Sequence, residues 1–431
     1  MFIKSITLEN IRGFKKLHFS LDRGDGNFAG WTVFTGDNGS GKSTLLKAIA
    51  VGLVGRDTAR ALQPSFHHWI REGIHRGSIG LEIVPVIPDD GFSSSGKDTA
   101  KPFPVKVGLL NGSKETSLEE ASPRGKPKSY STPQRSIWST SPKGWFSCGY
   151  GPFRRVFGAS PDATSQMVAA STERFVTMFQ EAASLGEVDQ WLRDLNHKSL
   201  ENKTAETQQL EILLTILRDE LMPNEITIDR VDSDGLWLRD RKGLKLAWTE
   251  MSDGYRSALA LLADILRHLI KAYGVTGLVG RDQDGRIFVK RSGVVLIDEI
   301  DAHLHPEWQR EIGFWLKRHF PHIQFLVTTH SPIICQAADE NGLFHLPEPG
   351  SDQKPRALSK EEYRRVIASR PDTILRTAAF GMENTRSPRA VAARSEYAKL
   401  MAKKRAGGKL SVSEKQRQTQ VELFALESED L

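Results

Sequence analysis

The sequence predicts an α/β fold in which a parallel sheet carries polar side chains at its carboxyl edge. A strand-like run ends in a glycine-rich turn at residues 36–44, directly before a helix. Two later apolar runs end in polar residues, one at Asp298 and one at His330. Because ligands bind at the carboxyl ends of parallel strands, we expect all three segments at one site.

Composition is that of an ordinary globular protein. The 431 residues are 39% hydrophobic and 26% charged, which allows two or three domains with ample core. No run approaches the roughly 18 apolar residues that span a bilayer, and the N-terminal strand-like segment lacks a signal-peptide core. Cys148 and Cys335 form no disulfide framework. We therefore expect a protein of the reducing cytoplasm.

Positive charge is unevenly distributed, although the net charge is only +6. Between residues 386 and 417 there are ten Lys/Arg against two Glu, and between 97 and 143 there are nine against four acids. Such runs are either solvated surface or contacts for a polyanion such as nucleic acid. Both interpretations remain open.

Changes in composition divide the chain into four parts. The N-terminal part with the glycine-rich loop is followed by a Ser/Pro/Gly/Lys-rich segment, which predicts a basic loop or β-hairpin insertion. The helical pattern that comes next breaks near Asn202. The last part is basic and helical, and its final hairpin should turn at Gly407-Gly408 and open its second helix with a Ser411/Glu414 capping box. The expected parts are 1–87, 88–144, 145–350 and 351–431.

The turn FTGDNGSGKST contains the pattern G-x-x-x-x-G-K-[ST] between a strand and a helix. Its glycines let backbone N–H groups point at a phosphate, and the helix N-terminus adds a positive dipole end. Lys42 would reach the β- and γ-phosphates of ATP, and Ser43 would hold Mg²⁺. The ATP-binding residues expected here are Gly36, Asn38, Gly39, Gly41, Lys42, Ser43 and Thr44.

The segment GVVLIDEIDAHLHP places four apolar residues before Asp298 and Glu299, as in a buried parallel strand. Asp298 would hold Mg²⁺ through water, and Glu299 would orient a water molecule against the γ-phosphate. His330 is either a hydrogen-bond donor to that phosphate or an ordinary turn histidine. His303 and His305 have no evident third partner, so no transition-metal site is expected.

The stretch WTEMSDGYRSALALLADIL predicts an amphipathic helix preceded by an unusual turn. Ser252 and Asp253 suit a helix cap, but Gly254 is a poor helix residue. The turn is therefore expected to hold something besides its own helix. Arg256 has no assigned role.

Taken in order, GDNGSGKST, MSDGYRS, LIDEIDAHLHP and TTHSP resemble ABC-type ATPase heads of the SMC and RecF kind. The resemblance implies a P-loop ATPase head, a mixed sheet flanked by helices, with a helical lobe and a C-terminal helical extension. It also implies that Ser252, Asp253 and Gly254 form a signature motif that closes another protomer's ATP site, hence a homodimer or higher oligomer. Asp253, Tyr255 and His305 depart from the residues of transporter motors, which argues against that class.

Five segments extend the resemblance to the ATPase subunits of Septu-type and retron-associated antiphage systems: SCGYGPFRR, SDGYRS, VLIDEIDAHLHPEWQR, VTTHSP and TRSPRAVAARSEYAKLMAKKR. It covers about two-thirds of the chain and omits mainly residues 88–144. It implies a sensor or regulatory ATPase beside a separate effector such as an HNH nuclease, with DNA as a further partner. Two alternatives remain, a RecF-like DNA-repair ATPase and a scaffold that binds ATP but barely hydrolyses it.

Three further residues are candidates under this resemblance. Gln134 lies in the region expected for the family's glutamine loop. Arg154 and Arg155 of GYGPFRR would contact phosphate or DNA, or else form a structural salt bridge. No acidic DxD cluster follows His330, so no fused nuclease is expected.

Overall fold

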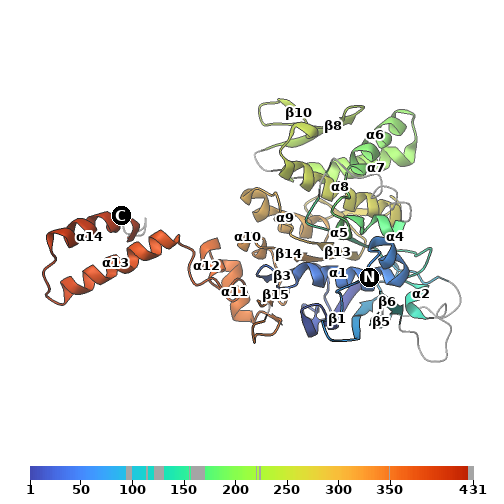
Figure 1. Ribbon diagram of the computed structural model, residues 1–431. Coiled ribbons are helices and arrows are strands. Elements are labelled where there is room, and N and C mark those ends of the chain that lie inside the picture. The colour runs from blue at the N-terminus through green and yellow to red at the C-terminus, as the bar shows by residue number, and fades with distance from the viewer. Residues whose placement is uncertain are drawn as a thin grey trace.

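The computed structural model describes residues 1–93, 100–112, 115–120, 131–154, 156, 170–219, 221–222, 225–348 and 350–425. Its layers run from an antiparallel sheet through a central helix and a mostly parallel sheet to a helical lobe, as Figure 1 shows from bottom to top. This is the mixed-sheet ATPase head that the sequence predicted.

The antiparallel sheet has five strands in the order β2-β1-β4-β5-β6. Its strands are β1 (Phe2–Ile11), β2 (Phe14–Ser20), β4 (Arg76–Val84), β5 (Phe103–Asn111) and β6 (Thr116–Glu120). The last two strands pair as an antiparallel hairpin within the segment 88–144, and that segment also contains α2 (Thr132–Arg135). The part boundaries proposed from composition stay a prediction.

The second sheet has six strands in the order β16-β15-β3-β14-β13-β7, and all neighbours are parallel except β15 and β16. Its strands are β3 (Gly30–Gly36), β7 (Ser147–Tyr150), β13 (Gly293–Ile297), β14 (Ile323–Thr328), β15 (Leu343–Leu346) and β16 (Arg356–Ala357). Strand β13 is buried on both faces, because Val294 and Leu296 pack toward one core cluster and Val295 and Ile297 toward the other. Because both faces are buried, every position of the strand is apolar, which explains the continuous apolar run before Asp298.

Helix α1 (Lys42–Leu62) packs between the two sheets. The sequence predicted a helix directly after the glycine-rich turn, and the observed helix runs on through a kink at Gly55, where φ is 77°. The ring of Trp138 lies so close to Gly55 that a side chain there would displace it. Gly55 therefore serves both the kink and the close approach.

The opposite face of the parallel sheet is covered by α8 (Asp253–Tyr273) and α9 (Pro306–His319). Above them lie the helices α6 (Glu187–Leu200) and α7 (Thr204–Arg218), separated at Asn202, which has a φ of 61°. The helix break predicted near Asn202 is confirmed. Helices α4 (Ala170–Glu173) and α5 (Val176–Phe179) pack against α1 instead. The other described elements of the head are β8 (Thr227–Asp232), β9 (Gly235–Arg239), β10 (Lys245–Ala247), η3 (Trp248–Glu250), β11 (Val279–Arg281), β12 (Ile287–Val289) and α10 (Pro332–Cys335).

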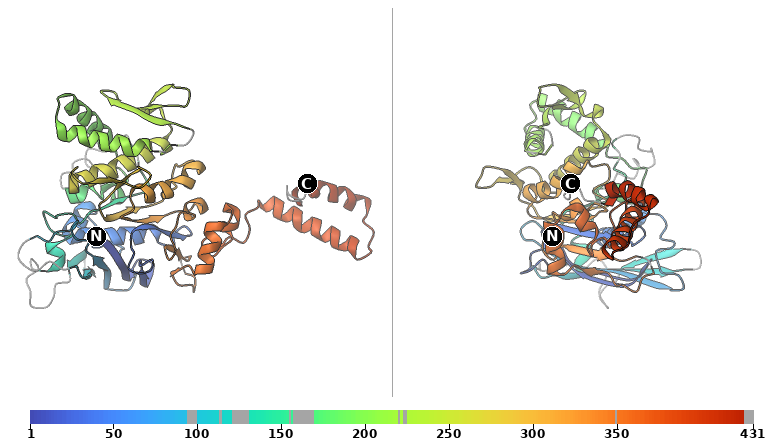
Figure 2. Two further views of the ribbon diagram at one scale, coloured as in Figure 1. Left: turned by 180° about the vertical axis from the view of Figure 1, so that it is seen from behind. Right: turned by 90° about the vertical axis from the view of Figure 1, so that its left-hand side faces the viewer.

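The described part of the chain after β16 contains four helices, α11 (Lys360–Ala368), α12 (Pro371–Leu375), α13 (Pro388–Arg405) and α14 (Val412–Ala425). Helices α13 and α14 form a hairpin that projects from the head, as Figure 1 and the left view of Figure 2 show. The predicted capping box is confirmed, because Ser411 N donates to Glu414 Oε2 at 2.8 Å and Glu414 N donates to Ser411 Oγ at 3.1 Å. Among the described residues, no helix is both long and apolar enough to cross a membrane.

Candidate functional site

Four strand ends meet at the carboxyl edge of the parallel sheet. Ile297, the last residue of β13, is in register with Val327 on β14 and with Tyr150 on β7. Thr328 on β14 is in register with Phe34, two residues before the end of β3. The glycine-rich turn, the Asp298-Glu299 pair and the loop carrying His330 therefore start from one edge, as predicted.

The glycine-rich turn has the backbone of a phosphate-binding loop. Gly41 precedes α1 with a φ of 95°, and Gly36 has a φ of 145°. A Cβ on Gly36 would overlap the carbonyl of Leu346, so the turn requires glycine there. Lys42 Nζ donates to the carbonyl oxygens of Gly36 and Asp37 at 2.7 and 3.0 Å. The ammonium group thus lies over the loop.

The carboxylates of Asp298 and Glu299 are close enough to Lys42 to affect its pKa. Burial lowers the pKa of Lys42, and the charges of Asp298 and Glu299 partly oppose that effect. Asp298 is buried, and Thr328 Oγ1 donates to its Oδ1 at 2.5 Å. The same Thr328 hydroxyl accepts from Glu299 N at 2.7 Å. Thr328 is a bridging residue that the sequence did not single out, because a threonine at a strand end is common.

The oxygen atoms at this edge suit Mg²⁺ bound together with a nucleotide. The Ser43 hydroxyl starts the first turn of α1, and Asp298 supplies a carboxylate, both hard donors that Mg²⁺ prefers. Ser40 Oγ is buried with no hydrogen-bond partner among the described residues, and it lies inside the glycine-rich turn. A bound phosphate group would provide the missing partner. The residues present therefore fit ATP and Mg²⁺.

A cavity of about 580 Å³ adjoins the phosphate loop. Arg12 and Phe14 line it from the β1–β2 turn, together with Ser40, Gly41 and Thr44. Arg12 Nη1 donates to Thr44 Oγ1 at 3.2 Å, which fixes the turn against α1. The volume falls in the range of small-molecule sites. Arg12 and Phe14 were not predicted from the sequence, because they join the site only through sheet packing.

Arg154 lies behind the carboxylate pair and does not reach into the cavity beside the loop. Its side chain is buried, and Nη1 donates to the carbonyl of Asp298 at 2.7 Å while Nη2 donates to that of Glu299 at 3.0 Å. Burial lowers its pKa to about 10, partly opposed by the nearby acidic groups. Of the two predicted alternatives, the structural one describes this contact, although the partners are carbonyls instead of a carboxylate. Arg155 lies outside the described residues.

The signature stretch begins α8 at the same edge of the head. Ser252 precedes the helix with an exposed side chain and makes no side-chain capping bond, so it is not used as the predicted cap. A Cβ on Gly254 would overlap the carbonyl of His303, which explains the glycine in a helix. Arg256 forms an ion pair with Asp253 and donates to the carbonyl of Thr249 at 3.2 Å. These contacts give Arg256 a local role.

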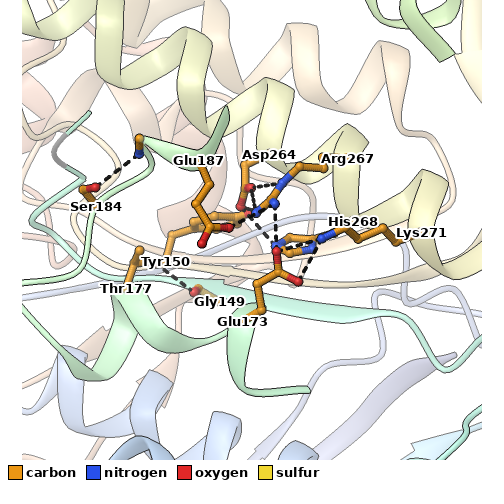
Figure 3. Close-up of polar contacts among 11 residues, drawn as sticks. Gly149, Tyr150, Glu173, Thr177, Ser184, Glu187, Asp264, Arg267, His268 and Lys271 are labelled. Carbon is orange, nitrogen blue, oxygen red and sulfur yellow. Dashed lines mark hydrogen bonds and ion pairs between the residues drawn. The ribbon is translucent and has the colours of Figure 1, made fainter. Parts of the chain in front are cut away.

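A buried polar network holds α8 against β7 (Figure 3). Asp264 Oδ2 accepts from Tyr150 Oη at 2.9 Å, and its Oδ1 accepts from Arg267 Nε at 2.8 Å. Arg267 Nη1 pairs in addition with Glu173 at 2.7 Å. Burial raises the pKa of Asp264, but the charges of His268 and Arg267 outweigh it and hold that pKa well below its usual range. The signature helix is thus fixed to the strand that precedes Arg154.

The histidines differ in their surroundings. His330 is exposed in the loop after β14, at the carboxyl edge. His305 Nδ1 accepts from Glu307 N at 3.4 Å and caps α9. Among the described residues no group of three or more His, Cys, Asp or Glu side chains is placed to hold a metal ion. His303 contacts Gly254 through its backbone carbonyl, and His305 caps α9.

Gln134 is not brought to the phosphate loop. Its Nε2 donates to Glu120 Oε2 on β6 at 2.7 Å, and the following Trp138 donates to the carbonyl of Gly52 at 3.0 Å. Gly52 lies ten residues along α1 from Lys42, which is about 15 Å of helix. Gln134, expected in a glutamine loop, is instead held at Glu120 on β6, and Trp138 after α2 contacts the middle of α1 at Gly52 and Gly55.

Comparisons with known proteins agree on the class of this site. Residues 31–336 match the family model described as "AAA domain, putative AbiEii toxin, Type IV TA system". Residues 1–53 also match the model described as "AAA ATPase domain". The first match includes the phosphate loop, the signature stretch and the Asp298-Glu299 pair.

Several curated proteins are similar in sequence. Septu protein PtuA of Bacillus mycoides is 26% identical over 336 residues, which is 77% of this chain and 38% of that protein. Retron Ec83 probable ATPase of Escherichia coli is 26% identical over 414 residues, covering 80% and 71%. DNA double-strand break repair Rad50 ATPase of Methanosarcina mazei is 47% identical over 55 residues, covering 13% and 5%. The chain thus spans well under half the length of the first relative.

Solved structures of similar fold include two Smc heads. One is the Smc head domain with an extended coiled coil bound to the C-terminal domain of ScpA from Pyrococcus furiosus, with a TM-score of 0.48 and 17% identity, covering 85% of this chain and 98% of that one. The other is the SmcHead bound to the C-winged helix domain of ScpA, with a TM-score of 0.46 and 16% identity, covering 84% and 99%.

Proposed function

We propose that this chain, which belongs to the AAA domain family matched over residues 31–336, binds and hydrolyses ATP and works as the regulatory ATPase of an antiphage defence system. The observation that carries the ATPase proposal is the meeting of Lys42, Ser43, Asp298 and Glu299 at one sheet edge. A cavity of suitable size adjoins the phosphate loop at Gly39, Ser40, Gly41 and Thr44. These features supply the phosphate cradle, the Mg²⁺ ligands and the water-orienting carboxylate of an NTPase.

Each residue has a stated task in this proposal. Backbone N–H groups of the loop and Lys42 hold the β- and γ-phosphates, and Ser43 and Asp298 hold Mg²⁺, which neutralises phosphate charge when bound. Glu299 accepts a hydrogen bond from the attacking water and orients it toward the γ-phosphate. His330 donates a hydrogen bond to the same phosphate group from the neighbouring loop.

We further propose that two heads close around two ATP molecules. Ser252, Asp253 and Gly254 would then meet the γ-phosphate held by the other copy. The exposed Ser252 hydroxyl, which its own helix does not use, supports this, as does its position at the N-terminus of a 21-residue helix. ATP binding would join the heads and hydrolysis would release them.

Glu299→Gln tests the mechanism. The amide keeps the shape of the side chain but orients water poorly, so kcat should fall by about 10²–10⁴-fold while ATP still binds. The variant should accumulate as an ATP-bound dimer, measured by light scattering with and without ATP. Lys42→Ala is the control, because it should lose ATP affinity and dimer together. Normal turnover in Glu299→Gln would contradict the role given to Glu299.

The defence role rests on the names of the relatives, a Septu protein and a retron ATPase. It includes a separate nuclease effector, such as an HNH protein, and action in the cytoplasm. The test is to express the chain with the gene encoded beside it and to measure phage plaques and co-purification. Protection that disappears in Glu299→Gln supports the proposal. A neighbouring gene that encodes no effector, together with no protection, would contradict it.

DNA is proposed as a further partner, on the evidence of the C-terminal hairpin. Its acids Glu396 and Glu414 pair across the hairpin with Arg417 and Lys403. Within the described residues, no ion pair involves five cations around the hairpin turn: Lys399, Lys404, Arg405, Lys409 and Lys415. A surface of exposed cations at the end of a projecting hairpin suits a phosphate backbone.

The matched test compares two pairs of adjacent exposed cations. Replacing Lys404 and Arg405 with Ala should weaken DNA binding and lower the slope of log K against log salt by about 1–2. Replacing Arg241 and Lys242, in the β9–β10 turn, should leave that slope unchanged. Equal effects of the two double variants would contradict binding at the hairpin.

The Rad50 similarity favours a second candidate, a DNA-repair ATPase with the same chemistry. Survival of a deletion strain separates the two. Sensitivity to DNA damage with unchanged phage plating would favour repair, and the reverse would favour defence.

A further inference from the structure

The turn after β13, which carries Glu299, is held by hydrogen bonds between its backbone and three other residues, Tyr150, Thr328 and Arg154. On the amide side, Asp298 N donates to the carbonyl of Tyr150 at 2.8 Å, and Ile300 N donates to that of Thr328 at 3.1 Å. On the carbonyl side, three consecutive oxygens accept from the guanidinium of Arg154, those of Asp298, Glu299 and Ile300, at 2.7, 3.0 and 3.4 Å. The Arg154 side chain thus donates hydrogen bonds to three consecutive backbone carbonyls of the turn.

The turn needs such support because Glu299 has a φ of 46°. A residue with a Cβ rarely adopts this left-handed conformation, and it persists only when its surroundings impose it. Arg154 meets the requirement with several donors in a planar fork, whereas lysine presents a single ammonium group. The hydrogen bonds with Arg154 and Thr328 therefore fix the backbone conformation of Glu299, and that conformation sets the direction of its side chain.

Arg154 is also attached to the signature helix. The buried Ser257 hydroxyl, in the first turn of α8, donates to the carbonyl of Arg154 at 3.0 Å. Gly254 packs directly on the carbonyl of His303, four residues beyond Glu299. The start of α8 and the turn at Glu299 are therefore joined by one hydrogen bond and one close backbone contact.

We infer that Arg154 is a positioning residue, which sets the backbone of Glu299 and couples it through Ser257 to the signature helix of the same head. The inference rests on the proposed function. In a sandwich of two heads, the signature of one head contacts the partner's ATP, while Glu299 acts on the ATP of its own head. The chain from Ser257 through Arg154 to Glu299 then links the two ATP sites, so hydrolysis should be cooperative.

Two variants and one control test the inference. Arg154→Lys keeps the charge but loses the fork. Ser257→Ala removes only the hydroxyl that joins the helix to Arg154. Ser136→Ala is the matched control, because Ser136 is a buried serine whose hydroxyl also donates to a backbone carbonyl, that of Thr132, at 2.7 Å in the α2 segment. We would measure four quantities for each protein: kcat, the Hill coefficient for ATP, Tm and the ATP dissociation constant. The dissociation constant is measured with Glu299→Gln added to each variant, so that ATP is not hydrolysed.

Arg154→Lys should lower kcat by about 10²-fold, the effect of a displacement near 1 Å, while the ATP dissociation constant changes by less than about threefold. Ser257→Ala should lower the Hill coefficient from between about 1 and 2 in the wild type toward 1. Ser136→Ala should change neither. The split between kcat and affinity separates positioning from general loss of structure, which would lower both together with Tm.

The inference is overturned if Arg154→Lys retains wild-type kcat, or if Ser257→Ala is as cooperative as Ser136→Ala. A wild-type Hill coefficient of 1 overturns the coupling. If Arg154→Lys does not fold, the Ser257→Ala comparison decides by itself. A wild type without turnover or ATP-dependent dimer would instead refute the proposed function, which is a different result.

Discussion

Two regions of the molecule contain ion pairs of nearly equal length, one pair buried and the other exposed. Beneath the signature helix, the Asp264 and Arg267 side chains are 4% and 8% exposed and lie 2.7 Å apart. Across the C-terminal hairpin, Glu396 and Arg417 are 39% and 53% exposed and lie 2.8 Å apart. The distances alone would rank the pairs as equal. Burial makes the first pair essential to its region and leaves the second nearly neutral.

The buried pair belongs to a network in which removing one member leaves others without partners. Asp264 serves Tyr150, Arg267 and His268 at once. In the exposed hairpin pair, water can replace either partner at a small cost in free energy, so removing one side chain leaves no buried group without a hydrogen bond. The predictions below test this contrast.

Asp264→Ala should have the largest effect. It leaves the buried Arg267 and Tyr150 short of a partner, and the free energy of unfolding should fall by about 3–5 kcal/mol. Denaturant unfolding followed by tryptophan fluorescence measures it. Asp264→Asn is the control that keeps an acceptor of the same shape and should lose less. A loss for Asp264→Ala no larger than that of a hairpin variant would refute the contrast.

Tyr150→Phe removes one hydrogen bond to the same carboxylate and keeps the ring. Since Asp264 retains Arg267 and His268, the free energy of unfolding should fall by about 1.5–3 kcal/mol, the range for bonds to charged groups. The same unfolding assay applies. An additive effect in the double variant Tyr150→Phe/Asp264→Asn would show that the two side chains do not interact.

The network also predicts sensitivity to acid. The pKa of Asp264 is held below its usual range by His268 and Arg267 after burial has opposed them, and that of Glu173 is likewise lowered by Arg267 and Lys271. A carboxylate with a depressed pKa stabilises the fold above its unfolded pKa, near 4, and loses this contribution as pH falls further. Stability should therefore drop below about pH 4, by up to about 1.4 kcal/mol per pH unit for each group. Asp264→Asn should show a shallower drop, and an unchanged profile would contradict this assignment.

Arg417→Ala in the hairpin should have the smallest effect. Its guanidinium is exposed and its charge is screened by salt, so the thermal unfolding curve should coincide with that of the wild type at moderate ionic strength. Circular dichroism at two salt concentrations checks this. A clear loss of helix would show that the hairpin depends on this pair.

The comparison between sequence and structure follows the same division. Motifs with a local cause were predictable, namely the phosphate loop at 36–44, the apolar strand before Asp298 and the capping box at Ser411. The residue types and their spacing along the chain are enough to predict the chemistry of these motifs. Gln134 was expected in a glutamine loop but pairs with Glu120 on β6, because its position depends on how its segment packs beside β6 and α1 and no local pattern records that packing.

Residues that act across the fold were beyond prediction for the same reason. Thr328 bridges Asp298 and Glu299 only because β14 lies beside β13. Arg12 and Phe14 reach the cavity beside the phosphate loop from the turn of a different sheet. Arg154 was recognised as a candidate, but its alternatives could not be separated until its carbonyl partners were known.

By itself the sequence determined the class of chemistry, since a phosphate loop, a carboxylate pair and a signature turn each require particular residues at short fixed spacings. The tertiary structure decided which side chains serve that chemistry from a distance. Tyr150 and Arg154 lie at and just after the end of β7, whereas their partners Asp264 and Ser257 come from α8, more than 100 residues later in the chain. Their roles depend on burial and hydrogen-bond geometry, and these quantities exist only once the layers of the head have packed.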